Sequence, residues 1–561
     1  MNWQSGLTMS TIFGSLALTA ACSNSAGPGG LPSCGARGTQ LSLAVAAAYT
    51  SIDPATDSGC VTFPANTAVD TAEYLVLPWS GGGTPGSSTQ FTLQSATPLP
   101  TIAMQSVSSL EPSLSGGAPS PHGPLAVAFD RFLRASARAH RYTIPVRSAA
   151  AATAVPSAAL SGPPTVGSAR TFKVCANVKC TSFDNVGAVA RSVGTHIAIY
   201  VDTLAPSPGL TTANLDSLRN VFDTKLYTVD TVAFGHVSDI DTNTVVIVLM
   251  TNTVNKLVTK ADCNSTNSYV AGFFFPADLA PGISQNYNNG EIFYSVVADS
   301  AGTLSCAHKP SEVNDVTPVT FTHEFQHMIN FVEHVLVKGG NTEEGWLDEG
   351  LSKYAEEISG RSFGDNAHFS QFAISAVYDG YQYLLNPGRS PLLIPEDTGS
   401  LAEVGASWLF TRYIVDQFGD SLAGRLVRTA MTGAANVAAQ TGQPFPQTVS
   451  RWALANWVSD LPGFTAPSEL QYTSWHFRTT FGSLHNQNPT NFPLAYPLVP
   501  TFSAGSAVNL SGTLWSGSGA YVRAVQPPNS AAFTLHFSGP SPGGAPVSPA
   551  IVPRLIVLRI R

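Results

Sequence analysis

Two histidines four residues apart, inside a segment that should be helical, most constrain what this chain can fold into. Thr317 can cap such a helix, Pro318 can occupy its first turn, and the helix should continue until Gly339. Because residues i and i+4 share one helical face, His323 and His327 would present both imidazoles to the same point. We therefore expect a second element to pack against this face and complete a site there.

This spacing is typical of a zinc site. Two imidazoles on adjacent turns suit the short zinc–nitrogen bond, and Glu324, next to His323, can reach a water on the ion and take its proton. A third histidine on the same stretch would have to stand at position 333, which is a glutamate. The alternative without metal is a helix with two hydrogen-bonded histidines and a solvated Glu324. A third ligand from elsewhere would decide between these readings.

We expect the third ligand on a second helix that folds back after the glycines at 339 and 340. Glu349 stands near the start of that helix, where its carboxylate could face the two imidazoles. The buried stripe of the helix would consist of Leu347, Leu351, Ala355 and Ile358. Two histidines, one carboxylate and an open fourth position form a catalytic rather than a structural zinc site.

The stretches HEFQHMIN and WLDEGLSKYAEE resemble the hyicolysin family of exported bacterial neutral metallopeptidases, within the gluzincin group. The later stretch GASWLFTRYIVDQFG is similar to the helix that follows in that family. The resemblance implies a zincin-like α+β fold and a zinc-dependent endopeptidase that hydrolyses proteins or peptides. It implies that Glu324 is the general base and that one zinc ion is held by His323, His327 and Glu349.

The resemblance leaves two further roles open. Aminopeptidase-like gluzincins carry an oxyanion-stabilising tyrosine where this chain has Ala402; here a phenol could come from Tyr378, Tyr381 or Tyr383, or these side chains pack in the core. The same relatives carry a second glutamate seven residues after the ligand, at the position of Glu356. This residue would either support a ligand from behind or be a solvated helix charge.

Changes in composition and turn-forming segments divide the 561-residue chain into several units. The expected fold class is α+β, with the metallopeptidase domain flanked by β-rich N-terminal and C-terminal domains. We expect an export signal at 1–22, a β-rich accessory domain with a terminal helix at 23–145, a linker at 146–168, the zinc metallopeptidase domain at 169–490 and a small C-terminal β domain at 491–561.

Two local predictions concern the surroundings of the site. The strand at 291–298 would form the sheet edge along which an extended peptide binds. The helix at 125–141 is basic, and we expect its charged face to be solvated, although basic amphipathic helices also lie on membranes. The charges on that face are Arg131, Arg134, Arg138 and Arg141.

The first 22 residues have the pattern of an export signal, because a short apolar stretch precedes small residues. They resemble a bacterial lipoprotein signal, in which Cys22 would be lipidated, although no Lys or Arg precedes the apolar stretch. Both a cell-envelope lipoprotein and a secreted protein therefore stay open. Six cysteines follow Cys22, and an even count in an exported chain favours disulfides; pairing of sequence neighbours is one of 15 connectivities.

The charge balance argues against nucleic acid as a binding partner. Lys and Arg number 28 against 36 Asp and Glu, and no long run of either sign occurs, so nucleic acid is a poor partner. Membrane contact would come only through a lipid at Cys22. Calcium is a weaker possibility at Asp239, Asp241 and Asn243, where Thr244 replaces the glycine that a calcium loop requires and a turn is the simpler interpretation.

Two other functions compete with the endopeptidase. The chain could be a non-catalytic exported surface lipoprotein or binding module, which would predict a broken ligand set. An aminopeptidase would need an acidic group for the free amine of its substrate, and no such element is visible before the histidine helix. Because all four chemical groups of the zinc motif are present, the endopeptidase is preferred.

Overall fold

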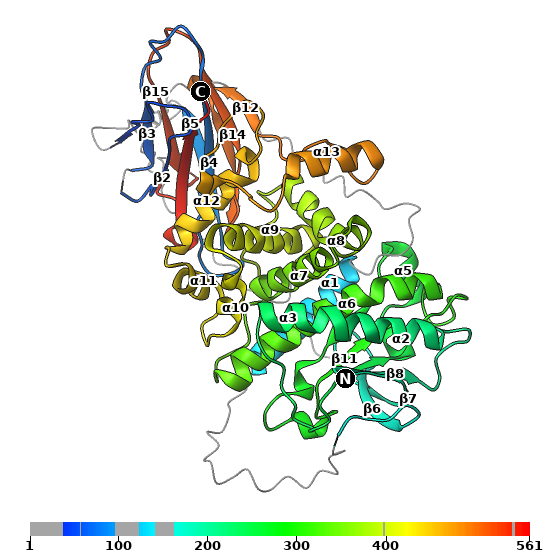
Figure 1. The fold of residues 1–561 in the computed structure, drawn as a ribbon. Coiled ribbons are helices and arrows are strands. Elements are labelled where there is room, and N and C mark those ends of the chain that lie inside the picture. Colours follow the sequence, from blue (N-terminus) through cyan, green and yellow to red (C-terminus); the bar gives the residue numbers. More distant parts are fainter. Residues whose placement is uncertain (1–37, 57, 96–122, 141–161, 396–398, 541–544) are drawn as a thin grey trace, which may run out of the picture.

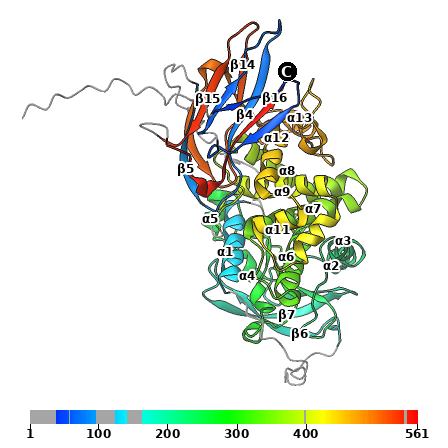
Figure 2. The same ribbon diagram turned by 90° about the vertical axis from the view of Figure 1, so that its left-hand side faces the viewer.

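The molecule mixes helices with three β-sheets. The computed structural model describes residues 38–56, 58–95, 123–140, 162–395, 399–540 and 545–561. A six-stranded sheet with its covering helices forms one end, two packed sheets form the other, and a group of helices lies between them (Figures 1 and 2). The expected export signal and Cys22 lie outside the described residues.

The six-stranded sheet has the order β10-β11-β9-β8-β7-β6. Strands β8, β9 and β11 run parallel, and the outer pairings β10 to β11, β8 to β7 and β7 to β6 are antiparallel. The strands are β6 (Ala169–Cys175), β7 (Phe183–Val193), β8 (Ile197–Asp202), β9 (Val246–Met250), β10 (Gly272–Phe274) and β11 (Ile292–Ser295).

Hydrophobic sequence explains which strands are central. Every residue of β9 and β11 is buried, as expected for parallel strands covered on both faces, whereas buried and less buried residues alternate along β7. The expectation that residues 291–298 form the sheet edge is wrong. Strand β11 lies between β10 and β9. The short strand β10 forms the edge; it precedes β11 in the chain, and a turn-rich loop connects the two antiparallel strands.

Helices cover the sheet and fill the middle of the molecule. They are α1 (Pro124–His140), α2 (Thr212–Val221), α3 (Tyr227–Ala233), α4 (Asn252–Asn255), α5 (Lys260–Thr266), α6 (Pro310–Phe331), α7 (Gly345–Ser362), α8 (Asn366–Leu385), α9 (Leu401–Phe418), α10 (Ser421–Val427), α11 (Gly433–Thr441), α12 (Phe445–Val458) and α13 (Phe477–Gln487). Short helical turns are η1 (Phe222–Leu226), η2 (Pro276–Asp278), η3 (Ser284–Asn286), η4 (Val332–Val337), η5 (Ser468–Leu470), η6 (Gly505–Ala507) and η7 (Pro549–Ile551).

Helix α6, which carries both histidines, starts earlier than expected. It begins at Pro310 rather than beside Thr317, because Glu312 accepts the Lys309 backbone N–H at 2.9 Å and Pro310 occupies the first turn. Pro318 therefore lies inside the helix. Downstream, the helix continues through η4 until Gly339, whose φ of 65° suits glycine and reverses the chain toward α7.

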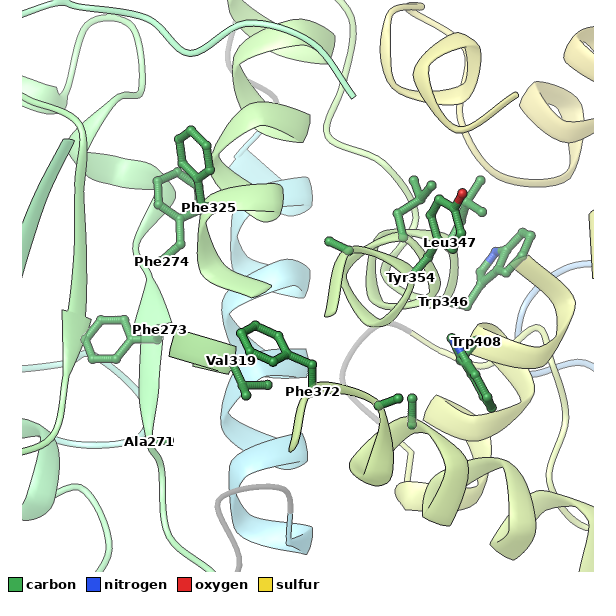
Figure 3. Close-up of a cluster of buried hydrophobic side chains, with 14 of the residues drawn as sticks. Ala271, Phe273, Phe274, Val319, Phe325, Trp346, Leu347, Tyr354, Phe372 and Trp408 are labelled. Carbon is green, nitrogen blue, oxygen red and sulfur yellow. The ribbon is translucent and has the colours of Figure 1, made fainter. Parts of the chain in front are cut away.

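Helices α6, α7, α8 and α9 share one apolar core with the sheet edge (Figure 3). The expected stripe on α7 is largely confirmed, since Leu347, Leu351 and Ala355 are fully buried. Close approach of α7 to α9 depends on a glycine: a Cβ on Gly350 would lie 2.3 Å from Thr411 Oγ1 and 2.6 Å from the Ser407 carbonyl oxygen. The structure thus fixes α7, the expected bearer of the third ligand, between α6 and α9.

The two β-rich ends of the chain form one unit, not two flanking domains. One sheet has the order β1-β3-β15-β5-β13 and the other β12-β14-β4-β16-β2, so each sheet combines N-terminal and C-terminal strands. Pairing between distant segments leaves no local signal in sequence, which is why the domain prediction failed here. The strands are β1 (Thr39–Gln40), β2 (Tyr49–Ile52), β3 (Cys60–Phe63), β4 (Ala72–Ser80), β5 (Ser88–Ser95), β12 (Thr501–Ala504), β13 (Asn509–Trp515), β14 (Val522–Gln526), β15 (Phe533–Ser538) and β16 (Pro553–Arg559).

Helix α1 follows β5 in sequence but packs against the sheet edge and α7 (Figure 2). The expectation of a solvated basic face is wrong, because Arg131 and Arg134 are only 1% and 5% exposed. Acidic side chains from α1 and α7 compensate the charge of Arg134, with Asp130 Oδ1 at 3.0 Å and Asp348 Oδ2 at 3.8 Å. Arg141 lies outside the described residues, as does most of the expected linker.

Two disulfides among the described residues each join a cysteine to the next cysteine along the chain. Bonds link Cys175 to Cys180 and Cys263 to Cys306, and Cys60 is also disulfide-bonded. Cys34 lies outside the described residues. Within the described part of the chain, no helix combines the length and apolar character that a membrane crossing requires.

Candidate metal centre

Three potential ligand atoms converge where α6 and α7 meet. The Nε2 atoms of His323 and His327 are 3.2 Å apart, and each faces the Glu349 carboxylate. Glu349 Oε1 lies 3.4 Å from His327 Nε2, and Glu349 Oε2 lies 3.9 Å from His323 Nε2. Helix packing thus brings the sequence-predicted ligand set together on one side of α6.

The spacing of these atoms fits a single tetrahedral metal ion. Zinc–ligand bonds of about 2.0–2.1 Å place neighbouring ligand atoms about 3.3–3.5 Å apart. The two imidazole nitrogens are 3.2 Å apart, and the nearest Glu349 oxygens lie 3.4 Å (Oε1) and 3.9 Å (Oε2) from them, so small side-chain adjustments would suffice. Two nitrogens and one carboxylate oxygen also match the preference of zinc.

A carboxylate lies beside the Nδ1 atom of each imidazole, on the side away from the ligand set. Glu356 Oε1 is 2.7 Å from His323 Nδ1, and Asp348 Oδ2 is 3.1 Å from His327 Nδ1. Each contact leaves the Nε2 atom of the imidazole free to face the site. Glu356 was expected from sequence to stand behind a ligand or in solvent, and it is fully buried behind His323.

Sequence reasoning gave Asp348 no role, although it precedes Glu349 directly. Burial and Arg134 would lower the pKa of His327, but Asp348 and Glu349 together raise it well above its usual value. Burial opposes ionisation of Asp348, yet His327 and Arg134 hold its pKa below the ordinary value. A metal ion at His327 Nε2 would therefore compete with a proton, as at other histidine sites.

Glu324, the expected base, lies beside the ligand set and next to the sheet edge. Its Oε2 accepts the Phe274 backbone N–H of β10 at 2.7 Å, and the residue is 5% exposed. The same cavity is lined by His323, Glu324 and Glu349, together with Gly272 of β10. A water molecule in this cavity would therefore lie near a carboxylate that could accept its proton.

Two further charged groups line this cavity and had no signal in sequence. Lys353 Nζ lies 3.2 Å from Glu356 Oε1 and 3.8 Å from Asp379 Oδ2. Burial raises the pKa of Asp379 to about 7 against the opposing charge of Lys353. Burial would lower the pKa of Lys353, but Glu356 and Asp379 raise it, so the amine stays charged. It supplies a fixed positive charge near the site.

The three tyrosines considered as oxyanion stabilisers do not line the cavity. The hydroxyl of Tyr381 donates to the Leu494 carbonyl at 3.0 Å, and Tyr383 is fully buried and stacked on Trp452. Tyr378 packs edge-on against Phe492. These contacts fit the alternative in which the three tyrosines pack in the core on helix α8.

The acidic residues considered for calcium form a turn before β9. The Asn243 side chain donates to Asp241 at 2.9 Å and accepts the Val245 N–H at 2.8 Å, as in an Asx turn. Asp239 and Asp241 approach the buried Glu291, and Arg170 already forms an ion pair with Asp241 at 3.4 Å. Calcium at this place stays a prediction.

Comparison with known proteins supports a metalloprotease. A stretch of 152 residues is 29% identical to the neutral metalloprotease ShpI of Staphylococcus hyicus. The match covers 27% of this chain and 32% of that protein, so the chain spans about a third of the relative's length. No family model matches the chain.

Proposed function

We propose that this chain is a zinc-dependent endopeptidase exported from a bacterium. The observation that carries the proposal is the convergence of His323, His327 and Glu349 at distances suited to one ion, with Glu324 beside them. The partial similarity to a neutral metalloprotease supports the same conclusion. A zincin-like domain around the six-stranded sheet, with protein or peptide as substrate, is part of the proposal.

Each side chain has a definite task in the proposed reaction. His323, His327 and Glu349 would hold the ion, oriented by Glu356 and Asp348. Bound zinc would supply Lewis acidity, which polarises a carbonyl group and makes a water molecule acidic. Glu324 would take the proton of that water and deliver it to the leaving amine. The Phe274 N–H fixes the Glu324 carboxylate in position for both transfers.

The sheet edge suggests how a peptide would bind. Strand β10 pairs with β11 on one side, and its other side borders the cavity that contains Glu324. An extended peptide could add to this edge through backbone hydrogen bonds, largely independent of its side chains. This mode suits internal segments of proteins and therefore favours an endopeptidase over an enzyme that binds a free terminus.

Export is supported by the disulfides and by the N-terminal sequence. Disulfides persist mainly in oxidising compartments, and those of this chain include Cys175–Cys180 and Cys263–Cys306. Whether Cys22 carries a lipid would follow from the mass of the mature N-terminus.

The Glu324→Gln variant tests the proposal. We expect it to lower casein hydrolysis by about 10²–10⁴-fold, because it removes the proton acceptor but no ligand. The bound zinc, measured by elemental analysis, should stay at one ion per chain. Glu312→Gln on the same helix is the control, since glutamine keeps the helix cap. Loss of zinc in Glu324→Gln, or equal activity in both variants, would contradict the assigned role.

A further inference from the structure

Helix α1 closes the cavity at the candidate metal centre. Ala126, Val127, Phe129 and Asp130 line that cavity together with the α6 and α7 residues. The Phe129 ring meets the Phe273 ring of β10 edge-on at 5.1 Å. The cavity has a volume of about 60 Å³, whereas pockets that take organic ligands usually measure about 300–1,000 Å³. With α1 in place, the cavity is too small for a peptide.

Asp130 directs its carboxylate at the ligand set. Its Oδ1 lies 4.0 Å from His327 Nε2, the atom that also faces His323 and Glu349. Ligand atoms of Asp130, Glu324 and His327 form a second group within 4.8 Å of one another, which shares His327 with the ligand set. Asp130 Oδ2 is buried and meets no hydrogen-bond donor among the described residues. A buried carboxylate oxygen in this position is suited to a cation.

Two arginines hold α1 against the site. Arg134 contacts Asp130 Oδ1 at 3.0 Å and Asp348 Oδ2 at 3.8 Å, and it donates to the Phe274 carbonyl at 3.4 Å. Arg138 donates to the Thr342 carbonyl at 2.5 Å in the connection between α6 and α7. The helix is thus fixed to the sheet edge, to α7 and to the loop before it.

The position of α1 conflicts with peptide binding at β10. The Phe274 carbonyl, which an added strand would use, already accepts from Arg134, and Phe129 covers the neighbouring Phe273. A peptide along this edge and α1 would therefore exclude each other. Asp130 would likewise exclude the water molecule from the fourth position of a tetrahedral ion.

We propose that α1 is a built-in inhibitor, in which Asp130 acts as a fourth protein ligand of the metal while the helix covers the peptide-binding edge. The inference rests on the proposed zinc site. Four protein ligands make a closed site of the structural type, and withdrawal of α1 would convert it to an open one. The chain as described is therefore a latent form of the enzyme.

The test compares Asp130→Ala with Ala128→Ser, an exposed control position on the same helix, in the zinc-loaded full chain. We expect a competing chelator to extract zinc at least tenfold faster from Asp130→Ala, because one ligand is lost. A peptide hydroxamate should bind at least tenfold more tightly, and a quenched fluorescent peptide should be cleaved at least tenfold faster. The control should match the wild type in all three.

A second variant keeps the test informative if Asp130→Ala does not fold. Arg138→Ala releases α1 from the Thr342 carbonyl but retains Asp130, so hydroxamate binding should tighten. Unchanged zinc extraction in Asp130→Ala, or weaker hydroxamate binding with loss of cleavage, would overturn the inhibitory role.

Peptide cleavage and zinc content together separate the inhibitory role of α1 from the zinc-endopeptidase function itself. If the wild type and Asp130→Ala cleave the peptide equally well, the function stands and α1 is no inhibitor. If neither variant holds zinc or cleaves, the enzyme assignment itself fails. The double variant Asp130→Ala with Glu324→Gln should hold zinc but lose the gained cleavage, which assigns that gain to the same site.

Discussion

Each candidate histidine ligand is backed by its own carboxylate. Glu356 lies behind His323 and Asp348 behind His327, both from helix α7. Such contacts fix the ring orientation and the tautomer, so they contribute to metal affinity without touching the ion. One helix thus supplies the third ligand and the supports of the other two.

Removing the charge behind His327 should weaken metal binding. For Asp348→Asn we expect zinc affinity to fall about 10–100-fold, because the amide no longer stabilises the ligand imidazole electrostatically. Competition with a chromophoric chelator measures this change. Asp365→Asn is the matched control, since that exposed residue caps α8 and asparagine caps equally well. Equal affinities in the two variants would show that Asp348 plays no such part.

Asp278 should make the folded state less stable as pH rises. Its side chain is fully buried between Asn288 and Tyr294, and burial raises its pKa to about 7. The unfolded chain releases this proton near pH 4, so stability is lost between about pH 4 and 7, by up to about 1.4 kcal/mol per pH unit. The melting temperature of Asp278→Asn should therefore change less over this range than that of the wild type. Parallel curves would refute the assignment.

The chemistry of the site was predictable from sequence as far as it is local. The spacing of His323, Glu324 and His327 within one helix and the placement of Glu349 on the next helix required only helical geometry. Asp130 and Lys353 were not predictable, because their approach depends on packing between elements that no short motif encodes. Sequence position likewise does not tell which way helix α8 is rotated, so it left the packing of the three tyrosines open.

At the scale of elements, the contact between α7 and α9 positions the third ligand. We expect Gly350→Ala to cost about 1–3 kcal/mol, since its methyl group would meet the Ser407 carbonyl oxygen at 2.6 Å and force the helices apart. Because Glu349 is the next residue, zinc affinity should fall as well. Thermal melting and chelator competition measure the two effects.

The control for this prediction is Gly482→Ala in α13. A Cβ there has its nearest neighbour at 4.0 Å, so alanine should be neutral or should stabilise the helix by up to about 1 kcal/mol. If both variants behaved alike, the close approach of α7 to α9 would not limit the fold.

Sequence patterns predicted which main helices and strands exist better than which of them contact one another. The apolar runs that become β8, β9 and β11 and the helices α6 and α7 are strongly patterned. The sequence offers two prolines for the first turn of α6, and Pro310 rather than Pro318 fills that position. The burial of Arg134 was not predictable because one of its two acidic partners, Asp348, lies far along the chain.

At the scale of the whole molecule, the β sandwich depends on both ends of the described chain. Strand β4 pairs with β14 and β16, and β5 pairs with β13 and β15. A chain that stops at residue 500 would leave both N-terminal strands without neighbours. We expect loss of amide protection in hydrogen exchange over residues 72–80 and a lower soluble yield.

Co-expression of residues 501–561 should restore part of that protection, because the missing strands can add from a separate chain. Persistent protection of residues 72–80 in the shortened chain alone would contradict the requirement for distant partners.

The pairing of Ser80 with Pro553 also sets an order of events during biogenesis. Strand β4 emerges from the ribosome long before β16, and in an exported chain it also crosses the membrane long before it. The sandwich therefore cannot close while the polypeptide is still being threaded, and its early segments need chaperones or a translocation channel to stay apart. Arrival of the late strands completes the sandwich only after the sheet and helices of the metal site have had time to assemble.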